Sequence, residues 1–180
     1  MLRVDALRFN RVGEIAELDL LNKVGEQQDS FTHHTRTILK KDEPHLDEWV
    51  IVDGNVALNG GIDELWTLFA GGSATPFDHD NAYIGVGDGS AAADPTQDAL
   101  QGTNQSFKGM NAGYPTYGSN QKWVGEASWG SDEGNFTWNE WGVANGDNPP
   151  TSGVLFNRKV ESLGTKTTGT WTLRVELAGS

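Results

Sequence analysis

Hydrophobic and polar residues alternate with a period of two over much of the second half of the chain, a pattern typical of half-buried β-strands. The clearest case is the last predicted strand, where Trp171, Leu173, Val175 and Leu177 share one face. The other strand candidates, in chain order, are segments 81–86, 107–110, 123–129 and 154–161. The pattern therefore predicts a chain rich in short strands.

Residues 123–141 hold four of the seven tryptophans. The pattern predicts two strands, 123–129 and 135–143, joined as a hairpin by a polar turn at 131–134. So much aromatic surface needs a second layer to pack against. Many short strands at regular spacing favour a mainly all-β fold, either a β-sandwich or a jelly-roll-like domain.

One segment follows the helical period instead. Ile62, Leu65, Trp66 and Phe69 fall at positions i, i+3, i+4 and i+7, which places them on one stripe of a helix. The glycine pair that follows, at 71 and 72, is a typical helix end. A second, shorter helix is predicted at 94–101, because an aspartate followed by a proline often begins a helix. We therefore expect one or two short helices in the fold.

The first 50 residues differ from the rest of the chain. They contain seven of the thirteen basic residues and no tryptophan before Trp49, and their strand-like alternation is imperfect. We predict that 1–50 is an extended N-terminal arm, or a set of edge strands, used for assembly, and that 51–180 is a tryptophan-rich β-sandwich domain. The apolar residues expected to make the contacts of the arm are Leu2, Val4, Leu7, Phe9 and Phe31.

Composition narrows the classes of partner. The formal net charge is −12, which argues against nucleic acid and against anionic lipid, because both attract clusters of lysine and arginine. Cysteine is absent, which excludes disulfides and thiolate chemistry. No apolar run approaches the roughly 20 residues of a membrane span, and the first residues lack the apolar stretch of a signal peptide. We expect a soluble protein made in a reducing cytosol.

Two glutamates form the best candidate acid pair. Glu126 and Glu140 lie on adjacent predicted strands, and glycoside hydrolysis requires two carboxyl groups that face each other. The alternation places Glu140 on the same face as Trp138, toward the core, where a carboxylate needs a cationic partner. We therefore predict a structural ion pair of Glu140 with Arg158 or Lys166 rather than catalysis.

The other candidate motifs are incomplete. The glycines of 85–89 lack the third glycine of a dinucleotide loop, and the aspartates of 78–88 depart from the pattern of a calcium-binding loop. No serine lies in a nucleophile elbow. We predict no catalytic residue, no cofactor and no metal. Three aromatic residues would mark a protein interface or a glycan site if they are exposed: Tyr114, Tyr117 and Trp141.

The order of the sequence motifs along the chain resembles that of a known group of proteins. In chain order the motifs are AYIGVGDG at 82–89, DPTQDALQ at 94–101, FKGM at 107–110, WNEWGV at 138–143, NRK at 157–159 and LGTK at 163–166. In order and kind they resemble small virion structural proteins of tailed bacteriophages, over residues 55–178.

The resemblance implies a non-enzymatic capsid decoration protein that binds and stabilises the joints between capsid subunits. The alternative that it implies is a tail-tip or fibre module that binds a host glycan. The expected partners are the major capsid protein or other virion proteins, and further copies of the chain in a homo-oligomer such as a trimer. Neither nucleic acid nor membrane is expected as a partner. The expected location is the virion, after synthesis in the bacterial cytoplasm.

Overall fold

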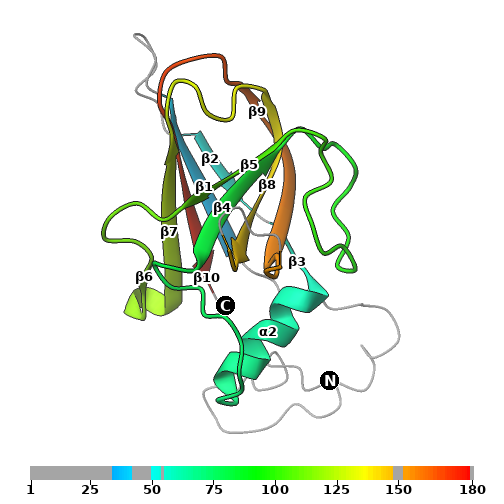
Figure 1. Cartoon of the computed structure of the whole chain (residues 1–180), viewed down its shortest axis with the longest axis vertical. Coiled ribbons are helices and arrows are strands. Elements are labelled where there is room, and N and C mark those ends of the chain that lie inside the picture. Colours follow the sequence, from blue (N-terminus) through cyan, green and yellow to red (C-terminus); the bar gives the residue numbers. More distant parts are fainter. Residues whose placement is uncertain (1–33, 42–49, 54, 148–151, 179–180) are drawn as a thin grey trace, which may run out of the picture. The chain divides into compact units, whose positions relative to one another are not determined.

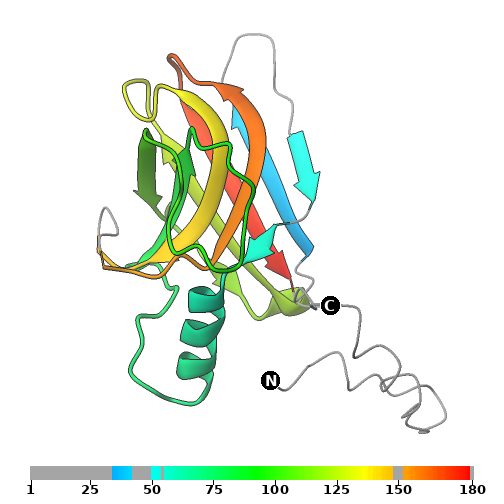
Figure 2. The same ribbon diagram turned by 90° about the vertical axis from the view of Figure 1, so that its right-hand side faces the viewer.

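A computed structural model describes residues 34–41, 50–53, 55–147 and 152–178. Residues 31–180 form one unit, and residues 1–30 form another that lies outside the described ranges. The described unit contains two five-stranded sheets whose strand pairs are all antiparallel (Figures 1 and 2). The prediction of a mainly all-β, sandwich-like fold is confirmed.

The first sheet has the strand order β2-β1-β10-β7-β6. Its strands are β1 (His34–Lys41), β2 (Val50–Asp53), β6 (Thr116–Tyr117), β7 (Lys122–Trp129) and β10 (Trp171–Ala178). The second sheet has the order β3-β9-β8-β4-β5. Its strands are β3 (Val56–Ala57), β4 (Ala82–Gly87), β5 (Gln105–Gly109), β8 (Thr137–Asn145) and β9 (Asn157–Thr165).

The core between the sheets is built on tryptophan. Trp129 and Trp171 are paired neighbours in the first sheet, and Trp138 reaches them from the second. The ring of Trp138 lies 4.9 Å from that of Trp129 and 5.0 Å from that of Trp171, in both cases edge to face. Such contacts stabilise a core beyond the apolar area that they bury. The period-two face of the last strand is confirmed, because Trp171, Leu173 and Val175 all belong to this core.

The predicted tryptophan hairpin is wrong in its pairing. Segments 123–129 and 137–145 are both strands, but β7 lies in the first sheet and β8 in the second. The connection between them therefore crosses from one sheet to the other. Alternation identifies the buried face of a strand, but the same pattern results whether two successive strands pair side by side or face each other across a core.

An irregularity in the pairing of β8 with β9 changes which residues point inward. The register shifts between the pairs Trp138–Gly164 and Glu140–Val160, and the alternation along β8 reverses there. Trp141 and Val143 therefore join Trp138 in the core. The prediction that Glu140 shares a face with Trp138 is wrong: the side chain lies on the outer face of the second sheet.

The predicted helix is confirmed as α2 (Asn59–Phe69), which lies at one end of the sandwich (Figures 1 and 2). It ends as expected, with Gly71 in the left-handed region at φ 74°. The only other helix within the described ranges is a 3-10 turn, η2 (Ser119–Gln121).

The predicted second helix, at 94–101, does not form. The carboxylate of Asp94 accepts hydrogen bonds from the N–H and hydroxyl of Thr96, which holds a turn. The N–H groups of Gln101 and Gly102 bind the carboxylate of Glu140 instead of carbonyl groups four residues earlier. Tertiary hydrogen bonds thus replace the helical ones.

The predicted arm is only partly within the described ranges. His34–Lys41 of this segment forms β1, which lies between β2 and β10 and pairs with both, inside the sheet of its own chain. The predicted contact residues of the arm lie outside the described residues; they are Leu2, Val4, Leu7, Phe9 and Phe31.

Candidate functional site

Glu140 and Arg158 form a fully buried ion pair. Both side chains have no exposed surface, and Nε of Arg158 lies 2.6 Å from Oε2 of Glu140. Glu140 comes from β8 and Arg158 from β9, two neighbours in the second sheet. The predicted pairing of Glu140 with Arg158 is confirmed.

Backbone amides complete the surroundings of this carboxylate. Oε1 of Glu140 accepts hydrogen bonds from the N–H groups of Gly89 at 3.2 Å, Gln101 at 3.0 Å and Gly102 at 2.6 Å. A Cβ atom at Gly89 would overlap both the carboxylate and the N–H of Gly102. Gly87, the last residue of β4, and Gly89 therefore make room for Glu140, while Gly85 makes room for the ring of Phe107. These contacts explain the glycine-rich motif at 85–89 without a nucleotide.

Arg158 holds the same loop from the other side. Its Nη atoms donate to the carbonyl oxygens of Ala91 and Ala92 and to Oε1 of Gln97, at 2.9–3.2 Å. Leu100 of this loop packs with Ala144 on the outer face of β8. Figures 1 and 2 show the β4–β5 connection lying over β8 and β9. We name this arrangement the Glu140 clamp: Glu140, Arg158 and the loop 88–104 that they bind.

A second carboxylate fixes the ends of this loop. Asp88 accepts hydrogen bonds from the backbone N–H of Asn104 at 3.0 Å and from its side-chain amide at 2.6 Å. The side-chain hydrogen bond from Asn104 is the main cause that lowers the pKa of Asp88 below its ordinary value. The loop is thus closed at its base and clamped along its length.

Lys166 does not join the clamp. It is fully buried, and its Nζ donates to the carbonyl of Gly130 at 2.7 Å and to Oδ1 of Asn135 at 2.9 Å. Burial lowers the pKa of this ammonium group. The prediction that named Lys166 as an alternative partner of Glu140 is wrong, since this lysine ties down the β7–β8 connection.

Glu126 is neutralised in the other sheet. Its Oε2 accepts hydrogen bonds from Nε and Nη2 of Arg174 at 2.9 and 2.6 Å, and Asn111 donates to Oε1. Because β7 and β8 belong to different sheets, Glu126 and Glu140 do not lie on adjacent strands as predicted. Each candidate acid has its own arginine, so the pair does not have the geometry of a glycosidase site.

The three predicted surface aromatics do not gather on one surface. Trp141 is fully buried in the core, so it does not meet the condition of exposure set for an interface or glycan residue. It turns inward beyond the register shift between Trp138 and Glu140. Tyr114 is half-buried, with the guanidinium of Arg174 5.6 Å from its ring centroid. Tyr117 is 74% exposed on the edge strand β6. A flat platform for stacking a sugar is therefore not formed by these three residues.

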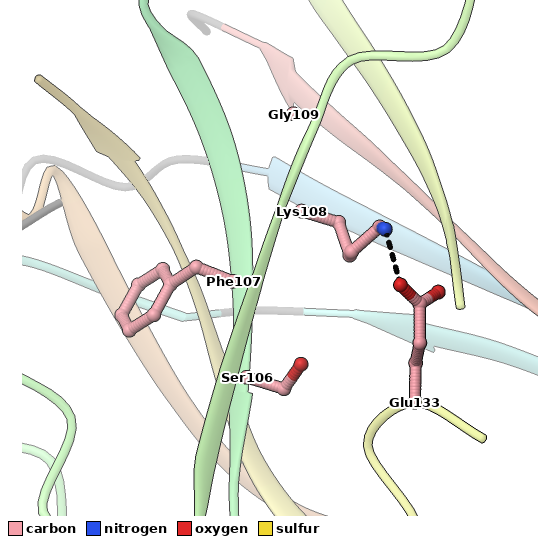
Figure 3. A pocket seen from close by; sticks show the side chains of 5 residues that line it. All are labelled: Ser106, Phe107, Lys108, Gly109 and Glu133. Carbon is pink, nitrogen blue, oxygen red and sulfur yellow. Dashed lines mark hydrogen bonds and ion pairs between the residues drawn. The ribbon is translucent and has the colours of Figure 1, made fainter. Parts of the chain in front are cut away.

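A pocket of about 400 Å³ lies beside the edge strand β5. Figure 3 shows Lys108 reaching toward Glu133 on one side of the strand, with Phe107 pointing to the other. Nζ of Lys108 lies 2.8 Å from Oε1 of Glu133, and Ser106 accepts a hydrogen bond from the indole of Trp129. The hydrogen bond from Lys108 is the main cause that lowers the pKa of Glu133. The polar groups of the pocket are thus already paired with one another.

The apolar stripe of α2 faces outward. Leu65 is 40% exposed, Trp66 45% and Phe69 83%, although a stripe of this kind normally faces the core. The start of the helix is attached to the sandwich, since Gly61, one turn before Leu65, packs directly on the backbone of Phe156. The sequence identified these residues as one face but gave no sign that the face is left uncovered, because that depends on how the helix is attached.

The attachment of α2 depends on one buried amide. Asn145, at the end of β8, donates to Oε1 of Glu64 at 3.0 Å and to the carbonyl of Thr75 at 2.7 Å. Glu64 also accepts from the N–H of Thr75. These hydrogen bonds direct the Glu64 side of the helix toward the sandwich and leave the apolar stripe outside.

Within the described part of the chain, histidine, aspartate and glutamate side chains form no group of three that could hold a metal ion. None of the helices in that part is long and apolar enough to cross a bilayer. Comparisons with protein-family models, with curated proteins and with solved structures find no match to this chain.

Proposed function

We propose that this protein is a non-enzymatic structural protein that docks on a larger assembly through one end of its sandwich. The observation that carries the proposal is the exposed apolar face of α2, formed by Leu65, Trp66 and Phe69. Exposed apolar side chains that adjoin one another are typical of protein-binding surfaces. We name this surface the α2 face.

The resemblance of the motifs to phage virion proteins gives the proposal its specific form. The assembly is the virion of a tailed bacteriophage, and the protein is a capsid decoration protein bound at the joints between capsid subunits. Copies of the chain follow the symmetry of the shell, for example as trimers. The partner is then the major capsid protein.

A structural role also agrees with how the polar groups are used. Glu140 and Glu126, the best candidate acids, are each bonded to an arginine inside the protein. The Glu140 clamp fixes the loop 88–104 on the outer face of the second sheet. The hydrogen-bonding groups of Glu140 and Arg158 are therefore used to hold this loop rigid. A rigid module loses little conformational entropy when it docks.

Docking would stabilise the shell by burying apolar surface. Each square ångström of apolar surface removed from water contributes roughly 25 cal/mol, and many copies bound to one particle add their contributions. The protein would act mechanically, by joining subunits, without any chemical step.

The test uses the particles whose genome encodes this chain. The protein should be present in stoichiometric amounts in purified particles, detected by mass spectrometry. After it has been stripped, the purified wild type should rebind, while Phe69→Ser should rebind at least about tenfold more weakly, as expected for loss of a central apolar anchor. Tyr117→Ser is the matched control, since it also removes an exposed aromatic ring but at a different site.

Two results would contradict the proposal. One is the absence of the chain from purified particles. The other is rebinding of Phe69→Ser with the affinity of the wild type while the variant remains folded. Because Phe69 is largely exposed, its substitution should change the free energy of unfolding by less than about 0.5 kcal/mol.

A further inference from the structure

We propose that the α2 face binds an apolar protein surface that is rimmed by lysine and arginine. The inference rests on the docking part of the proposed function and names the chemistry of the partner. It is carried by two features of the described residues: the spacing of the apolar side chains on α2 and the sign of the charge around them.

The apolar residues of α2 have the spacing of helices that bind in grooves. Ile62, Leu65, Trp66 and Phe69 occupy positions i, i+3, i+4 and i+7, the set of anchors used when one face of a helix lies in an apolar groove. The rings of Trp66 and Phe69 are 5.9 Å apart and nearly perpendicular. They form one continuous aromatic surface at the free end of the helix, of the residue types that dominate binding energy at interfaces.

The helix has little support of its own along this face. It has 11 residues, and a helix of that length is marginal in water unless tertiary contacts hold it. Described contacts that hold it include those of Gly61, in its first turn, and of Glu64, on the side turned toward the sandwich, and both come before the turn that carries Phe69. A partner on the α2 face would therefore add the apolar contacts that the sandwich does not supply.

Charge around the helix is negative. Residues 42–107, which include α2, contain twelve aspartates and glutamates and neither lysine nor arginine. The formal net charge of the chain is −12, so this segment accounts for all of it. Within the described residues, Asp63 is exposed on the helix itself and Asp80 in the segment that follows it. The α2 face is thus an apolar stripe in the most acidic part of the chain, with the exposed carboxylate of Asp63 on the same helix, and we refer to this charge as its acidic border.

Four cations of the described residues already have acidic partners. Lys108, Lys122, Arg158 and Arg174 each contact a glutamate at 2.6–2.8 Å. The nearest of these four to α2 in the sequence is Lys108, after the acidic segment has ended. These four side chains are therefore engaged away from the carboxylates of that segment.

This charge selects among the possible occupants. A second copy would bring two acidic borders together, and like charges across an interface oppose binding. Phosphate-rich partners, whether nucleic acid or anionic lipid, would be repelled in the same way. A protein surface with an apolar centre and basic side chains around it satisfies both the stripe and its border.

The experiment uses the full-length protein and two synthetic amphipathic peptides as probes. Both peptides carry the same leucine stripe, but the polar positions are lysine in one and glutamate in the other. Isothermal titration calorimetry should detect binding of the lysine peptide to the protein and no binding of the glutamate peptide. Its affinity should fall as salt shortens the Debye length from about 30 Å at 0.01 M to about 10 Å at 0.1 M.

Variants locate the binding site. Phe69→Ser and Trp66→Ser should each weaken binding of the lysine peptide at least about tenfold, while Tyr117→Ser should leave it unchanged. Equal binding of both peptides would overturn the inference, as would binding that is insensitive to the two α2 substitutions. Concentration-dependent self-association that Phe69→Ser abolishes would also overturn it, because a second copy would then be the occupant.

The inference and the proposed function can fail separately. If the chain is absent from particles but the lysine peptide binds at α2, the virion assignment fails and the basic partner surface remains. If the chain rebinds particles through Phe69 but binds the lysine and glutamate peptides with equal affinity, the virion assignment remains. The inference that the partner surface is basic is then wrong.

Discussion

At the scale of single residues, Glu140 has the largest structural role in the second sheet. Its two oxygens accept hydrogen bonds from four groups, namely Arg158 and the N–H groups of Gly89, Gln101 and Gly102. A buried carboxylate is costly unless such partners are present. The arginine could be predicted from the sequence on this ground alone, whereas the three amides could not, since they depend on the path of a loop.

The buried pair should respond strongly to loss of its arginine. Arg158→Met leaves Glu140 buried without its counter-charge, and we expect a loss of about 3–5 kcal/mol in the free energy of unfolding. Arg174→Met is the matched control, because Arg174 also lies 2.6 Å from a glutamate but is partly exposed; its loss should cost about 1 kcal/mol or less. Urea denaturation of both variants measures the difference. Equal costs would contradict the special role of the clamp.

Asp88 should make part of the stability depend on pH. The pKa of Asp88 is lowered in the folded state, mainly by the hydrogen bond from the side chain of Asn104. The ionised carboxylate therefore stabilises the fold above the ordinary pKa of an aspartate, and this stabilisation is lost as the pH falls through the pKa of the folded state. Asp88→Asn should therefore show a smaller fall in urea midpoint between pH 5 and pH 2.5, values that bracket the ordinary pKa of about 3.9. Asp98→Asn, in the same loop, serves as the control, and an identical fall in Asp88→Asn and wild type would refute the assignment.

At the scale of elements, the sequence predicts where the strands lie better than it predicts which strands pair with each other. The alternation locates the faces of β7 and β10 because each has one face in the core. It does not reveal that β7 and β8 lie in different sheets, since pairing depends on contacts distant in the sequence. It also misplaces Trp141 and Glu140, because the register with β9 shifts between Trp138 and Glu140 and the alternation along β8 reverses there.

The break in the alternation can be tested by deletion of Asn139. With this residue removed, strict alternation still places Trp138, Trp141 and Val143 on the core face, so we expect the near-UV circular dichroism signal of the tryptophans and cooperative unfolding to be kept. Asn139→Ala is the control: it keeps the spacing and removes one hydrogen bond, to the carbonyl of Asp88, at a cost of about 1 kcal/mol. Loss of both signals in the deletion variant would show that the register depends on Asn139.

At the scale of the whole described unit, rigidity and binding surface are separated in space. The tryptophan core and the Glu140 clamp occupy the two faces of the second sheet. Helix α2, whose apolar side chains are exposed, lies at one end of the sandwich (Figure 2). The helix and its apolar stripe could be predicted from the helical spacing of the apolar residues. The exposure of that stripe could not be predicted, because it is decided by the contacts of Glu64 with Asn145 and of Gly61 with Phe156, which attach the helix to the sandwich.

Hydrogen exchange of the free and particle-bound protein tests the central claim most directly. In the free protein the amides of 62–69 should exchange faster than those of β4 and β8, because the helix has little tertiary cover. On particles whose genome encodes the chain, exchange at 62–69 should slow at least about tenfold, a change of about 1.4 kcal/mol in local opening, while β4 and β8 stay unchanged. If 62–69 exchange equally fast in both states while another surface becomes protected, the α2 face is not the docking surface.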